Sequence, residues 1–170
     1  GIRFLKHVAR TRRLLHIVDV MPIDQSDPVQ NAQMIIDELE KFSPELAKLP
    51  QILVLNKIDQ IAEDEQNEVC THIVAELGWT GMVFRTSTLT GEGVQAVVHH
   101  LMNEIEREQE REAQDPIFAE EQQERFERLE SQVRHNIEAQ KQAYRAAQKA
   151  VREGVKNIDD DDGVEVVYAP

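Results

Sequence analysis

The residues best suited to specific chemistry form an Asn-Lys-x-Asp pattern, made of Asn56, Lys57, Ile58 and Asp59. They directly follow an apolar run at residues 52–55, which is typical of a buried β-strand. The Asp59 carboxylate offers two acceptor oxygens, which match the adjacent N1–H and exocyclic amine donors of guanine. Adenine lacks this donor pair and would leave a buried carboxylate unpaired, at a cost of about 1–3 kcal/mol or more. The pattern therefore predicts a guanine-reading loop, although an ordinary polar turn after a strand also fits it.

The other two polar residues of the pattern have less defined roles. The Asn56 amide can contact the base edge or brace a neighbouring loop. The aliphatic stem of Lys57 can lie along the flat face of the base. The sequence leaves both possibilities for Asn56 open.

A second loop supports the guanine interpretation. Residues 87–93 read Ser-Thr-Leu-Thr-Gly-Glu-Gly and follow a further strand pattern at residues 82–86. Ser87, Thr88 and Leu89 are placed to direct backbone N–H groups at the guanine O6, and the glycines shape the turn into the next helix. A pair of such loops after successive buried strands is far more specific than either loop alone.

The alternation of strand and helix patterns predicts an α/β fold with a parallel three-stranded sheet and right-handed crossovers. We expect strands at residues 14–20, 51–55 and 82–86, with the first buried on both faces. Helices are expected at residues 2–12, from Pro28 to Phe42, from about Glu63 to Leu77, and after residue 93. In such sheets ligands bind beyond the carboxyl ends of the strands, which is where both loops lie.

Composition separates this part from the remainder of the chain. Residues 1–109 carry the strand and helix alternation, residues 110–155 a long charged helical pattern that Gly154 is expected to end, and residues 156–170 an acidic tail with a short strand pattern. The net charge of −13 over 170 residues argues against a free-standing non-specific nucleic-acid binder, although local basic patches remain possible. The single cysteine, Cys70, fits a reducing compartment. With no apolar run long enough for a membrane and no signal-peptide pattern, a cytoplasmic protein without a membrane partner is expected.

With these two loops in place, the sequence resembles a known family, the Obg group of ribosome-associated GTPases. The resemblance covers most of residues 1–109 and includes the segments at 1–7, 15–19, 27–29 and 38–41, together with both loops. The acidic run followed by residues 163–168 is similar to the tail of some bacterial members. Thr88 stands where the family usually has Ala.

The resemblance implies the C-terminal half of a P-loop-type GTPase domain. It implies that Asn56, Lys57, Ile58 and Asp59 bind GTP or GDP, with Ser87, Thr88 and Leu89 completing the base pocket. It also implies Mg²⁺ as a cofactor and the large ribosomal subunit or its rRNA as a partner.

The elements for phosphoryl transfer are absent from the sequence. None of its seven glycines is followed by Lys, as a phosphate-binding loop requires, and the Asp-x-x-Gly spacing from Asp160 to Gly163 has no strand before it. We therefore expect the Mg²⁺ ligands in an N-terminal part outside this chain, no catalytic or metal-binding residue within it, and no hydrolysis of GTP by this chain alone.

The strand from Leu14 to Val20 is expected to have an unpaired edge, because the family's sheet order makes the three strands neighbours. Such an edge invites pairing with the N-terminal half of the domain or with a second copy of the chain.

Two other interpretations remain open. The chain could be an α/β interaction module without a nucleotide role, acting through its long helix and acidic tail. A metal site at His99 and His100 is less favoured, because adjacent histidines on a helix point in different directions.

Overall fold

A parallel sheet of three strands, in the order β1-β2-β3, forms the centre of the fold in the computed structural model. The strands are β1 (Leu14–Asp19), β2 (Gln51–Asn56) and β3 (Met82–Thr86). The structure describes the backbone of residues 11–159 and the side chains of residues 11–139 and 141–151. The predicted α/β fold with a parallel three-stranded sheet is confirmed.

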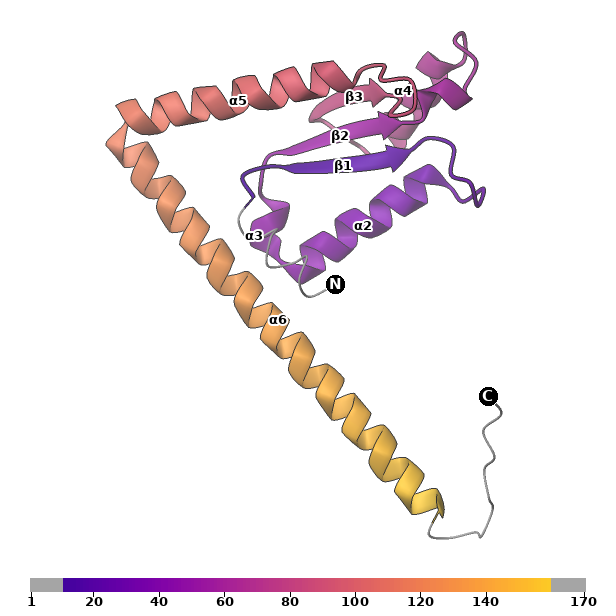
Figure 1. Cartoon of the computed structure of the whole chain (residues 1–170), viewed down its shortest axis with the longest axis vertical. Helices are drawn as coiled ribbons and strands as arrows, with labels where there is room; N and C mark the ends of the chain where they lie inside the picture. Colours follow the sequence, from indigo (N-terminus) through magenta and orange to yellow (C-terminus); the bar gives the residue numbers. More distant parts are fainter. Residues whose placement is uncertain (1–10, 160–170) are drawn as a thin grey trace.

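Helices cover both faces of the sheet (Figure 1). On one face, α2 (Pro28–Phe42) and α4 (Gln66–Glu76) bury a cluster that includes Leu53 and Leu55, both 0% exposed. On the other face, α5 (Val94–Gln114) packs its Val97 against the alternate residues of β2. The near-continuous apolar run of β2 follows from burial on both faces.

Strand β1 is an edge strand, and the prediction that it is buried on both faces is wrong. Val18 is buried toward α2 and α4, but Leu15 is 37% exposed and Ile17 is 61% exposed on the other face. The helix α5 packs on β2 and β3, so it leaves that face of β1 uncovered. The strand also ends at Asp19 rather than Val20.

The start of α2 is as the sequence predicts. The Asp27 side chain caps the helix by accepting a 2.8 Å hydrogen bond from the Val29 amide, and Pro28 occupies the first turn. Ser43 ends α2 and also caps the short helix α3 (Pro44–Ala47), which was not predicted from the sequence. Ser-Pro serves here as both a stop and a start signal.

The remaining boundaries differ modestly from the predictions. Helix α4 begins at Gln66 rather than near Glu63, because residues 62–65 form a turn. Gly78 follows it in the left-handed conformation (φ 57°), as a helix-ending glycine should. Of the helix expected at residues 2–12, residues 2–10 lie outside the described part, and residues 11–13 are not helical.

Helix α6 (Pro116–Asp159) follows α5 after a sharp turn at Asp115 and passes the end of the domain at which α3 lies (Figure 1). Its Leu129, Val133 and Ile137 pack against α3 and the end of α2. The Gln132 side chain accepts hydrogen bonds from Ser43 Oγ (2.5 Å) and the Glu45 amide (3.3 Å). The domain boundary expected at residue 109 falls inside α5.

The expectation that Gly154 ends the long helix is wrong, because α6 continues to Asp159. Glycine keeps its backbone N–H, so it weakens a helix by only about 1 kcal/mol and need not end it. The predicted strand in the acidic tail lies outside the described residues.

Candidate functional site

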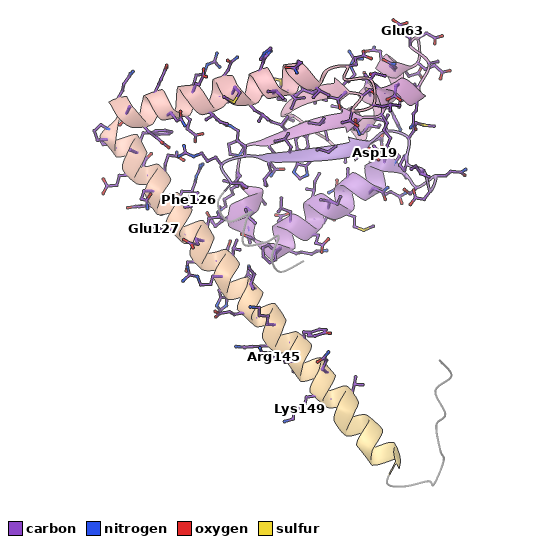
Figure 2. All side chains as sticks on the ribbon, in the orientation of Figure 1. Asp19, Glu63, Phe126, Glu127, Arg145 and Lys149 are labelled. Carbon is purple, nitrogen blue, oxygen red and sulfur yellow. The ribbon has the colours of Figure 1, made fainter. Side chains whose placement is uncertain are left out.

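The carboxyl ends of the three strands bring polar residues into one row. In the register of the sheet Asp19 pairs with Asn56, and Asn56 pairs with Thr86. Figure 2 shows Asp19 at this end of the sheet. Both loops with predicted function begin here, because one follows Asn56 and the other follows Thr86.

The Asn56 side chain connects the ends of all three strands. Its Nδ2 donates to Asp19 Oδ1 at 3.1 Å, while its Oδ1 accepts from the Thr88 backbone N–H at 3.1 Å and from Thr86 Oγ1 at 3.4 Å. Since a carboxylate only accepts, the amide nitrogen must face Asp19 and the oxygen must face Thr88. Asn56 is only 7% exposed. Of the two roles left open by the sequence, the described contacts favour the brace.

Lys57 turns the chain sharply out of the sheet. Its backbone is left-handed (φ 68°, ψ 33°), a conformation uncommon outside glycine, asparagine and aspartate. Its ammonium Nζ lies 2.8 Å from Asp19 Oδ2, so one carboxylate holds both Asn56 and Lys57. Next comes the short helix η1 (Ile58–Gln60), anchored by Ile58, which is 2% exposed.

Asp59 stands in η1 with its side chain exposed to solvent. Within the described part of the chain its carboxylate makes no hydrogen bond or ion pair. The side chains of its two neighbours in the pattern are not available in this way, because Lys57 is paired with Asp19 and Ile58 is buried. Asp59 is therefore the residue of the pattern whose acceptor oxygens are available to a ligand.

The second loop is closed by Ser87, which is fully buried. The Ser87 N–H donates to the Glu92 carbonyl (3.0 Å), its carbonyl accepts from the Gly91 N–H (2.8 Å), and its Oγ accepts from the Thr90 N–H (3.1 Å). The polar atoms of Ser87 thus serve the loop itself.

Thr88 and Leu89 form the outer part of this loop. The Thr88 N–H is engaged by Asn56, whereas its side chain is exposed, so the hydroxyl has room beside the loop. Leu89 is 84% exposed, and its backbone N–H has no hydrogen-bond partner among the described residues.

Gly93 fixes where the second loop returns to the sheet. Its φ of +70° favours glycine, and a Cβ at this position would lie 2.0 Å from the carbonyl oxygen of Arg85. No other residue fits without moving the end of β3.

The structure thus connects Asn56, Lys57 and Thr88 through direct hydrogen bonds or a shared partner, and it places Ile58 and Ser87 as buried supports. Asp59 and Leu89 lie exposed on the two loops. No role was predicted for Asp19 from the sequence, although a carboxylate that ends an apolar strand beside the strand of Asn56 is a usable signal.

Other sites considered from the sequence have simpler surroundings. His100 packs against the ring of Phe84 at a centroid distance of 5.3 Å, while His99 is exposed. Among the described side chains, no three or more His, Cys, Asp or Glu residues gather as metal ligands would. No helix in the described region combines the length and apolar character required to cross a bilayer.

Comparison with known proteins gives the wider relationship. No model of a protein family matches the chain. Over 175 aligned residues, which include the whole chain, it is 72% identical to the GTPase Obg of Psychrobacter sp. (strain PRwf-1). The chain spans 44% of that protein's length. With such identity along its entire length, the chain belongs to the Obg family of GTPases and corresponds to a C-terminal part of such a protein.

Proposed function

We propose that this chain carries the guanine-recognition part of a GTP- and GDP-binding GTPase domain. The observation that carries the proposal is the exposed, unengaged carboxylate of Asp59 beside a loop that is braced on both sides. A preorganised acceptor of this kind binds its ligand without first giving up a protein partner.

In the proposed pocket, Asp59 accepts from the guanine N1–H and exocyclic amine. The Leu89 N–H, which is unengaged by other described residues, donates to O6, and the stem of Lys57 lies along the base. Asn56, Ile58, Ser87 and Thr88 hold the two loops in place through the contacts described above.

The phosphates and Mg²⁺ are assigned to a part of the GTPase domain outside this chain. The described residues offer no cluster of metal ligands, and the sequence contains no Gly-Lys phosphate-binding pattern. We expect the chain alone to bind guanine nucleotides weakly and to hydrolyse none. By family membership, the whole protein is proposed to act on the large ribosomal subunit in the cytoplasm.

The uncovered face of β1 is proposed to pack against the rest of that domain. Leu15 and Ile17 are exposed there, and Val98 and Met102 of α5 are 44% and 49% exposed. An apolar surface next to an unpaired strand edge is typical of a sheet that continues into further structure. In isolation, the same surface would support association of two copies.

The test is an NMR titration of the chain with GDP and, separately, with ADP. We expect GDP to shift the backbone amide signals of residues 57–60 and 87–89, with weak affinity, and ADP to leave them unchanged. Equal shifts with both nucleotides would contradict the proposed pocket. So would the absence of any shift at the highest GDP concentration that can be reached.

A further inference from the structure

The apolar stripe that docks α6 on the domain continues beyond the contact. Leu129, Val133 and Ile137 are only 1–3% exposed against α3 and the end of α2. Farther along the same stripe, at successive seven-residue intervals, Tyr144 and Val151 are each 66% exposed. Figure 1 shows this distal part of α6 extending away from the sheet. A helix without tertiary contacts is marginal in water, so a partner on this stripe would stabilise it.

Charge is distributed unevenly along α6. In its docked part, glutamates alternate with arginines, and two of these arginines are paired: Arg128 with Glu124 at 3.2 Å and Arg134 with Glu130 at 3.1 Å. Residues 139–151 contain no Asp or Glu at all, in a chain with a net charge of −13. The distal part of α6 is therefore a local positive region on an acidic protein.

The three basic residues of this region share one face of the helix. Lys141, Arg145 and Lys149 are spaced four residues apart, which places each above the last. Arg145 and Lys149 lie on the part of α6 that extends beyond the domain (Figure 2). Neither Lys141 nor Arg145 forms an ion pair with any side chain that the structure describes. A row of cations with this spacing matches successive phosphates of a polyanion.

Tyr144 borders this basic face and adds a second recognition element. Its hydroxyl accepts a 2.9 Å hydrogen bond from Gln148 Nε2, which steadies the ring on the helix surface. An exposed aromatic ring beside cations is suited to stacking on an unpaired base while the cations bind the backbone. A segment made of acidic side chains alone would pair with the cations but would offer no flat group to stack on the ring.

We propose that the distal part of α6 binds a single-stranded segment of RNA. Lys141, Arg145 and Lys149 contact its phosphates, and Tyr144 stacks on one of its bases. The surface is distant from the loops at Asp59 and Leu89, so this inference is independent of the proposed guanine site.

The test measures binding of the full chain to a short fluorescently labelled single-stranded RNA by anisotropy, across a series of salt concentrations. In the variant Lys141→Gln/Arg145→Gln/Lys149→Gln, we expect affinity to fall at least about tenfold and the salt slope to decrease by about 2. Tyr144→Leu should weaken binding about tenfold with an unchanged salt slope.

The matched control removes three arginines that are also exposed, in the variant Arg107→Gln/Arg128→Gln/Arg134→Gln. It changes the net charge equally, and we expect affinity within about twofold of the original chain if the distal face is specific. Equal weakening by the two triple variants, or no salt-dependent binding by the original chain, would overturn the proposal. Tighter binding of a polyglutamate peptide, or of DNA with the same sequence, would overturn the assignment to RNA. No nucleotide is present in the assay, so failure of the guanine site would not affect it.

Discussion

The Asp19 carboxylate holds Lys57 by a 2.8 Å ion pair across the ends of two neighbouring strands. The same carboxylate accepts a hydrogen bond from Asn56, so it fixes two residues of the Asn-Lys-x-Asp loop at once. Asp19 contacts no base in the proposed pocket. It acts as a positioning residue whose loss would release the loop that presents Asp59.

Substitution of Asp19 can separate these two contacts. In Asp19→Asn the new amide oxygen can still accept from Asn56, but the pair with Lys57 is lost. Asp19→Ala removes both. In a full-length family member that carries this segment, we expect GDP affinity to fall about threefold for Asp19→Asn and about tenfold or more for Asp19→Ala. Isothermal titration calorimetry would measure both affinities, and wild-type affinity in Asp19→Ala would refute the positioning role.

Gly93 should tolerate no side chain, whereas Gly91 should. Both have positive φ, but a Cβ at Gly93 would meet the Arg85 carbonyl oxygen at 2.0 Å, and nothing lies within 4 Å of a Cβ at Gly91. We expect Gly91→Ala to lower the free energy of unfolding by about 1 kcal/mol through backbone strain alone, and Gly93→Ala by at least twice that amount. Urea unfolding would compare the two variants, and equal losses would contradict the geometry of this loop.

Ile17 on the uncovered face of β1 should control association of the isolated chain. We expect the chain to form oligomers or to be poorly soluble, and Ile17→Lys to increase the monomer fraction, because a charge on an edge strand opposes pairing. Ile23→Lys is the control, since Ile23 is 90% exposed in the following loop and outside the strand. Light scattering after size exclusion gives the masses. A monodisperse monomer of the original chain would contradict the prediction.

His16 should make stability depend on pH. Burial lowers the pKa of His16 from its ordinary value of 6.5, and this outweighs the opposing hydrogen bond with Gln51. Below that ordinary value the unfolded chain binds more protons than the folded chain, so stability is lost as pH falls from 6.5 through the lower folded pKa. Urea midpoints of the chain should fall more steeply between about pH 7.5 and pH 5 than those of His16→Gln. His99→Gln, at an exposed position, should retain the full dependence.

Much of the fold was predictable because the strands are largely apolar and several helices have a local start or stop signal. Asp27 and Pro28 begin α2, and Gly78 follows the end of α4, as these residue types commonly do. The exposed face of β1 was not predictable, because the run from Leu14 to Val18 has the composition of a strand buried on both sides. Which strand faces are covered depends on where α5 packs, and that is a tertiary property.

The candidate site was predictable in its location and less so in the division of roles. The sequence predicted both loops at the same edge of the sheet. It could not show that the Asn56 amide forms hydrogen bonds with Asp19 and Thr88. It also could not show that Ser87 is buried within its own loop. Such assignments depend on hydrogen-bond partners that are distant in the sequence.

The most direct test of the guanine pocket is the nucleotide preference of Asp59→Asn in a full-length family member that carries this segment. The Asn amide can donate to the C2 carbonyl of xanthine, which replaces the exocyclic amine of guanine, so we expect weaker binding of GTP and stronger binding of XTP. Asp64→Asn, the same change at an exposed position of the neighbouring turn, should leave the preference unchanged. Unaltered preference for GTP in Asp59→Asn would contradict the assignment of Asp59 as the guanine-reading residue.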